Sequence, residues 1–111
     1  MRTKRIVFGL LKIKGGNYMK HYIIVKFNED YNYLKQLEDI QKLFNKALTI
    51  NGINRIDIYQ SNSNKVNRHD LMIKMDLTNE SLVEFDNSWI HAKWKSEYGK
   101  YIQSKTIFDC E

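Results

Sequence analysis

Residues 69–77 alternate between apolar and polar side chains more regularly than any other part of this sequence. Successive side chains of a β-strand point to opposite faces of a sheet, so this period of two predicts a strand with one face in the core. Directly after it, Thr78-Asn79-Glu80-Ser81 offers a helix cap with an acidic residue in the first turn. We therefore predict that the strand leads into a short helix through Leu82 and Phe85.

Two strands, with one longer helix between them, are predicted before this segment. Residues 21–27 are rich in β-branched and aromatic side chains, which predicts a strand. Residues 53–59 favour a second strand, after Asn51-Gly52 ends the helix between them. That helix shows apolar residues at spacings of three and four, which give one apolar stripe: Leu34, Leu37, Ile40, Phe44, Ala47 and Leu48.

A second helical piece and a last strand complete the pattern. The helical pattern breaks near Asn87-Ser88, and Thr106-Ile107-Phe108 predicts the closing strand. The order is therefore β-α-β-β-α-β, which predicts an α+β, ferredoxin-like fold with both helices on one face of an antiparallel four-stranded sheet. The second helical piece carries large side chains at spacings near four: Trp94, Tyr98, Tyr101 and Ile102.

The face of this sheet that the helices leave open is also apolar. Tyr22, Ile24, Met72 and Phe108 have the opposite strand parity to the residues that face the helices. An exposed apolar face of this kind is removed from water when two copies pack sheet to sheet, most commonly around a two-fold axis. The sequence therefore predicts a homodimer through the sheet face.

The net charge of +5 does not indicate a nucleic-acid partner, because it lies entirely in the first 18 residues. Residues 19–111 carry 13 basic and 13 acidic side chains. The longest apolar runs, residues 6–11 and 22–25, are far shorter than the roughly 20 residues of a membrane span. The single cysteine, Cys110, excludes an intramolecular disulfide and indicates a cytoplasmic protein.

Residues 1–18 are predicted to be a non-native or disordered extension, with the domain beginning at Met19. The codons for Lys14-Gly15-Gly16 can hold the purine-rich sequence AGGAGG shortly before the ATG of Met19, which looks like a bacterial ribosome-binding site read as protein. The abundance of Lys, Asn, Ile and Tyr agrees with a low-GC bacterium. A native basic arm at the membrane surface is the alternative.

The order of these elements resembles the stress-responsive A/B barrel (Dabb) family of dimeric α+β barrels. The resemblance covers nearly all of residues 19–111 and rests on three segments: Lys20-His21-Tyr22-Ile23-Ile24-Val25-Lys26-Phe27, residues 69–77, and Ile107-Phe108-Asp109. In the family's plant polyketide cyclases, a histidine matching His91 is the acid/base residue, and one matching His21 lines the same site. The family's His-Pro-Ala-His appears here as Ser88-Trp89-Ile90-His91, and Phe85 stands where a substrate-holding tyrosine is expected.

Two functions remain open from the sequence. One is an enzyme or binder of a small apolar or aromatic molecule, held between helices and sheet, with His91 and His21 as catalytic residues; the other is a non-catalytic, stress-related homodimer with a packed interior. No phosphate loop, dinucleotide fingerprint, CxxC pair or nucleophile elbow is present, so no cofactor is expected, and the histidine spacing predicts no metal site. The expected substrate-binding residues are Val25, Phe27, Phe44, Ile73, Phe85, Trp94, Tyr98 and Ile107.

Overall fold

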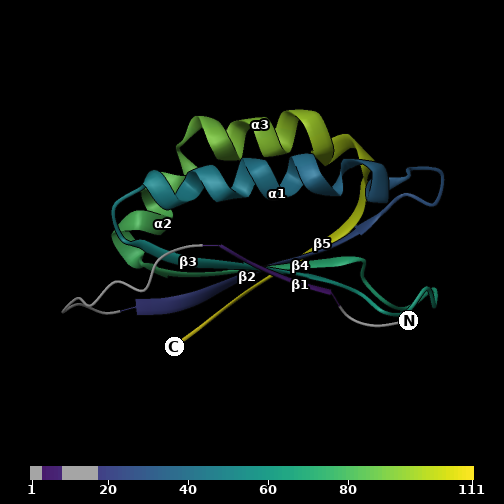
Figure 1. Ribbon diagram of the computed structural model, residues 1–111, viewed down its shortest axis with the longest axis horizontal. Coiled ribbons are helices and arrows are strands. Elements are labelled where there is room, and N and C mark those ends of the chain that lie inside the picture. The colour runs from purple at the N-terminus through teal and green to yellow at the C-terminus, as the bar shows by residue number, and fades with distance from the viewer. Residues whose placement is uncertain (1–3, 9–17) are drawn as a thin grey trace.

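The computed structural model describes residues 4–8 and 18–111. They form one antiparallel sheet of five strands in the order β1-β3-β4-β2-β5, and the helices cover one of its faces (Figure 1). Strands β2 to β5 make the ferredoxin-like sheet, so the predicted fold class is confirmed. The strands are β1 (Lys4–Phe8), β2 (Tyr18–Phe27), β3 (Ile53–Gln60), β4 (Leu71–Thr78) and β5 (Ile102–Cys110).

The helical layer consists of α1 (Leu37–Asn45), α2 (Asn79–Asp86) and α3 (Trp89–Tyr98). Short 3-10 turns extend α1 at both ends, over Tyr33–Gln36 and Lys46–Thr49, and another, Gly99–Tyr101, follows α3. Figure 1 shows α1 and α3 side by side above the sheet, with α2 at the end of that layer. The sheet and this one layer of helices enclose the hydrophobic core between them.

The cap predicted between the alternating strand and its helix is confirmed. The Thr78 hydroxyl accepts a hydrogen bond from the Ser81 backbone N–H at 3.2 Å, and the Ser81 hydroxyl lies 2.9 Å from the Thr78 backbone N–H. Each side chain therefore satisfies a backbone donor that the first turn of α2 leaves free. The predicted break at Asn87-Ser88 separates α2 from α3, and the Ser88 hydroxyl caps α3 at the His91 backbone N–H.

The apolar residues of β4 face the core, as the alternation in the sequence predicts. Leu71, Ile73, Met75 and Leu77 are at most 1% exposed beneath the helices. Strand β4 begins at Leu71, two residues later than the sequence pattern indicates, and β5 is much longer than the predicted Thr106-Ile107-Phe108. The length of β5 has a tertiary cause, because its backbone pairs with β2 over nearly the whole of that strand.

Strand β1 extends the sheet beyond the four strands that the sequence predicts. It pairs with β3 from Lys4 opposite Gln60 to Phe8 opposite Ile56. The rest of the predicted extension, residues 1–3 and 9–17, lies outside the described residues. The expectation that the native chain begins at Met19 stays a prediction.

Candidate functional site

A histidine–carboxylate pair joins the central strand β2 to the edge strand β5. His21 and Asp109 are directly opposite each other in the β2–β5 register, and His21 Nδ1 lies 2.5 Å from Asp109 Oδ1. An ionised carboxylate can only accept hydrogen bonds, so His21 Nδ1 is the donor and carries the proton. His21 is 6% exposed, with the fully buried Met75 opposite it on β4.

The second ring nitrogen of His21 is not used by this pair. No hydrogen bond from Nε2 to another group is found within residues 4–8 and 18–111. With Nδ1 protonated, Nε2 of a neutral imidazole presents a lone pair, which can accept a proton from another molecule. The Asp109 carboxylate thus holds the ring in the tautomer and orientation that a general base requires.

The pair lies where the helical layer no longer covers the sheet. On the same face of β5, Ile107 is 47% exposed and the Asp109 side chain is 44% exposed, although their neighbours Ile23 and His21 on β2 are buried. The middle of β5 is exposed on both faces. Ile107 and Asp109 therefore form an open shelf beside His21, which we call the β5 shelf.

His91 occupies a different setting, at the start of α3. Its backbone N–H is bonded to the capping Ser88, and its Nδ1 lies 3.1 Å from the carbonyl oxygen of Asp86. Its ring centroid is 5.3 Å from that of Phe85. These contacts hold the His91 ring against the junction between α2 and α3, and they leave its Nε2 as the nitrogen available for chemistry.

The expected substrate-binding residues, other than Ile107, are buried in the core between sheet and helices. Phe44 contacts both Trp94, at 5.0 Å between ring centroids, and Phe85, at 6.2 Å. Trp94 continues the aromatic cluster to Tyr98, at 5.4 Å. On the sheet side of the core, Val25 and Ile73 are each 0% exposed. Phe27, 2% exposed, stacks on Tyr33 at 5.2 Å. These side chains fill the space that the sequence analysis assigned to a ligand.

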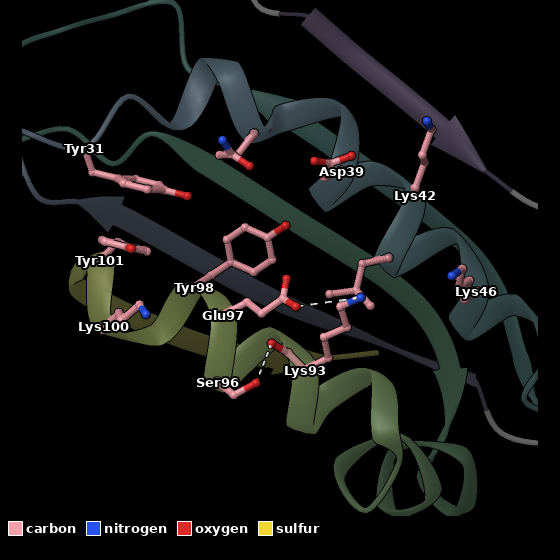
Figure 2. A pocket seen from close by; sticks show the side chains of 12 residues that line it. Tyr31, Asp39, Lys42, Lys46, Lys93, Ser96, Glu97, Tyr98, Lys100 and Tyr101 are labelled. Carbon is pink, nitrogen blue, oxygen red and sulfur yellow. Dashed lines mark hydrogen bonds and ion pairs between the residues drawn. The ribbon is translucent and has the colours of Figure 1, made fainter.

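Neither His21 nor His91 lines either of the two pockets described next. The larger, about 660 Å³, is a groove between α1 and α3 (Figure 2). The smaller, about 200 Å³, lies on the open face of the sheet beside Ile24, Met72 and His69. The histidine roles and the substrate-binding roles of the core residues stay predictions.

The remaining candidate residues are dispersed. His69 Nε2 lies 3.5 Å from the Ser104 hydroxyl in an exposed contact, and Cys110 is a free thiol. Within residues 4–8 and 18–111, no three His, Cys, Asp or Glu side chains gather as a metal site would require. The same residues contain no helix long and apolar enough to cross a bilayer.

Several solved structures have the same arrangement of strands and helices. A protein of unknown function from Thermobifida fusca, described as dimeric and ferredoxin-like, superposes with a TM-score of 0.70 at 11% identity, over 83% of this chain and 88% of that one. The chain has a ferredoxin-like fold. A Dabb family protein from Mesorhizobium loti shares this ferredoxin-like fold with a TM-score of 0.65 at 9% identity, over 85% of this chain and 95% of that one. The predicted resemblance to the Dabb family is thereby confirmed for the fold.

The same ferredoxin-like fold occurs in longer chains. A Fusobacterium nucleatum protein named "Putative monooxygenase" matches with a TM-score of 0.75 at 8% identity, over 95% of this chain. Our chain spans 47% of that protein, about half its length. No protein-family model matches the sequence, and no curated protein matches it.

Asp109 is the residue of this site that the sequence analysis missed as a functional group. A signal for it was present, because Asp109 shares parity with Ile107 in the last strand and His21 with Ile23 in the first. That parity places each residue on the helix-facing side. The register that brings the two together depends on the pairing of β2 with β5, which the sequence alone does not specify.

Proposed function

We propose that this protein transfers a proton to or from a small apolar or aromatic molecule, with His21 as the acid/base residue and Asp109 as its positioning residue. The observation that carries the proposal is the 2.5 Å contact between His21 Nδ1 and Asp109 Oδ1 on a histidine that is 6% exposed. A carboxylate on one ring nitrogen fixes the tautomer of the imidazole and the direction of the other nitrogen. The β5 shelf supplies the place for the substrate.

The substrate lies, in this proposal, on the β5 shelf and not inside the core. Ile107 lies two residues before Asp109 on the same face of β5, and its apolar side chain is half exposed. Phe44, Phe85 and Trp94 occupy the interior, so a molecule there would have to displace packed aromatic rings. Among the predicted substrate-binding residues, this assigns direct contact to Ile107.

The geometry favours His21 over His91 as the first proton carrier. His91 has a backbone carbonyl as its Nδ1 partner, which orients the ring but adds no negative charge. His21 has a carboxylate in the same role, and the charge stabilises the imidazolium that forms when Nε2 accepts a proton. We keep His91 as the candidate for a second proton carrier.

We also propose that the working form is a homodimer joined through the open face of the sheet. Phe108 is 57% exposed on this face, next to Tyr22 at 6.2 Å between ring centroids. Ile24 and Met72 are half-buried beside the smaller pocket. The Thermobifida fusca neighbour is described as dimeric, and so is a ferredoxin-like neighbour from Bacteroides fragilis.

The acid/base function can be tested without knowledge of the substrate. In 5-nitrobenzisoxazole, a base removes the C3 proton, the N–O bond breaks and its electron pair stays on oxygen, which gives a nitrile and a phenolate. We expect the protein to accelerate this ring opening over buffer, and His21→Ala to lower the enzymatic rate by about 100-fold, the size of a general-base contribution. Asp109→Asn should give an intermediate rate, because the ring loses its orienting charge.

Lys95→Ala is the control, since Lys95 lies on α3, away from both the β5 shelf and the open face of the sheet. It should leave the rate at the wild-type level. Circular dichroism melts of all variants establish that each is folded. A wild-type rate that equals the buffer rate, or an undiminished rate in His21→Ala, contradicts the proposed acid/base function.

A non-catalytic homodimer with a packed interior is the second candidate. The observation in its favour is the aromatic cluster of Phe44, Phe85, Trp94 and Tyr98, which occupies the space beneath the helices. The same measurement separates the two candidates, because this function requires no ring opening above buffer in wild type or in any histidine variant.

A further inference from the structure

The groove between α1 and α3 has two chemically different ends. The helices run antiparallel across it, so the start of α1 faces the end of α3 (Figure 2). At that end lie Tyr31 and Tyr101, stacked at 4.0 Å between ring centroids. At the other end lie three lysines, which we call the lysine end: Lys42, Lys46 and Lys93.

Tyr98 supplies a hydrogen-bonding group between these two ends. Its side chain is 5% exposed and lines the groove, and Figure 2 shows its hydroxyl directed toward the α1 side. The Tyr98 hydroxyl is not among the buried side-chain atoms that lack a hydrogen-bond partner in the described residues, so its oxygen reaches the solvent of the groove. A phenol whose ring is buried and whose hydroxyl opens into a groove can donate a hydrogen bond to a ligand there.

The charges around Tyr98 decide which ligand group it can meet. Burial raises the pKa of Tyr98 to about 12, and the nearby carboxylates of Glu97 and Asp39 add to this effect. The hydroxyl therefore remains a neutral donor at physiological pH. The same carboxylates would repel a negative charge at this position, so the phenol suits an uncharged acceptor such as a carbonyl oxygen.

The lysine end suits the opposite part of such a ligand. Four lysines and two carboxylates line the groove, so it has an excess of positive charge. Lys93 lies 3.8 Å from Glu97, and Lys42 lies 3.1 Å from Glu38 outside the groove. Both are exposed i,i+4 pairs, which contribute little stability, so these lysines can turn to an incoming anion at small cost.

We propose that the α1–α3 groove binds a small organic anion with an apolar body. Its carboxylate or phosphate contacts the lysine end, its body lies over Leu43, and an uncharged oxygen accepts a hydrogen bond from Tyr98. Leu43 is 5% exposed and lines the floor of the groove. A volume of about 660 Å³ is within the range of small-molecule sites. This site is separate from His21 and from the β5 shelf.

The test uses 4-acetylbenzoate, which carries a carboxylate, an aromatic ring and a ketone in one line. Titration followed by ¹⁵N–¹H NMR should shift the amides of α1 and α3 and give a Kd. We expect 4-ethylbenzoate, which lacks the acceptor, and acetophenone, which lacks the anion, to bind more weakly. Tyr98→Phe should weaken 4-acetylbenzoate about fivefold, which is the scale of one hydrogen bond, and leave 4-ethylbenzoate unchanged.

Lys93→Met should weaken both benzoates and reduce the salt dependence of their binding. Lys95→Met is the matched control: Lys95 is also on α3 but outside the groove, and this variant should bind as wild type does. The NMR spectrum of each variant reports whether it is folded. No binding of 4-acetylbenzoate at millimolar concentration, or equal affinity in wild type and a folded Tyr98→Phe, overturns the proposal whatever the outcome for His21.

Discussion

The candidate chemistry of this protein depends on single side chains whose neighbours come from distant parts of the chain. His21 and Asp109 are 88 residues apart in sequence and 2.5 Å apart in space. The family resemblance and the strand parity of His21 predict that it lines the site. The same resemblance predicts His91 as the acid/base residue, although the structure gives that ring a backbone carbonyl as its partner. The carboxylate beside His21 therefore changes which histidine is the better general base.

Tyr98 gives a prediction for stability at alkaline pH. Its pKa rises from 10.0 to about 12 in the folded protein, so the unfolded chain ionises this phenol first as the pH increases. The stabilising effect is complete below pH 10 and is lost as the pH approaches 12. Urea unfolding should show that wild type loses on the order of 2 kcal/mol more than Tyr98→Phe over this interval. Parallel pH profiles of the two proteins would contradict the prediction.

At the scale of elements, local sequence signals were accurate where the stabilising contacts are local. The capping box of α2 joins Thr78 to Ser81, three residues away, and the sequence predicted it. Strand β5 shows the opposite case, because its residues are largely exposed and carry only a short apolar signal. Its nine residues are extended because β2 provides hydrogen-bonding partners along them.

The junction between the α1 segment and β3 contains a glycine that its surroundings require. Gly52 has a φ of +100°, which other residues rarely adopt, and an added Cβ would lie 2.8 Å from Thr78 Oγ1 and 2.9 Å from Ser81 Cβ. We expect Gly52→Ala to lower the free energy of unfolding by about 1–3 kcal/mol, through backbone strain and disturbance of the α2 cap. Thermal and urea unfolding measure this loss.

Gly99→Ala is the control for the same substitution. Gly99 has helical backbone angles, and nothing lies within 4 Å of an added Cβ. This variant should be neutral or more stable by up to about 1 kcal/mol, because alanine reduces the freedom of the unfolded chain. A loss of stability equal to that of Gly52→Ala would show that the crowding at Gly52 is not the cause.

In the molecule as a whole, helices cover one face of the sheet and leave the other face open. The open face combines apolar side chains, such as Phe108, with charged rows in which Asp76 lies between Lys20 and Arg55. This mixed surface is compatible with a sheet that packs against a second copy, where apolar area is buried and charges set the register. The strand parity predicts the apolar residues of this face, and the strand register shows how the charged residues lie among them.

The dimer proposal predicts that Phe108→Asp separates the subunits, because it places a charge on the most exposed apolar side chain of the proposed interface. Light scattering coupled to size-exclusion chromatography should show a dimer for wild type and a monomer for this variant at micromolar concentration. Val83→Asp is the control, since Val83 is 61% exposed on α2, in the helical layer. It should stay dimeric. A monomeric wild type, or a dimeric Phe108→Asp, contradicts an interface on the open face.

The sequence by itself determined the order of the elements from β2 to β5, the faces of β4 and the cap of α2, because periodicity and capping depend on residues close together in the chain. Only the tertiary structure decided that Phe44, Phe85 and Trp94 fill the interior, since spacing shows which side chains face inward and not whether they leave room. It also decided that His21 meets Asp109 and that the Tyr98 hydroxyl opens into a groove. These contacts depend on strand register and helix packing between distant segments, which no local pattern specifies.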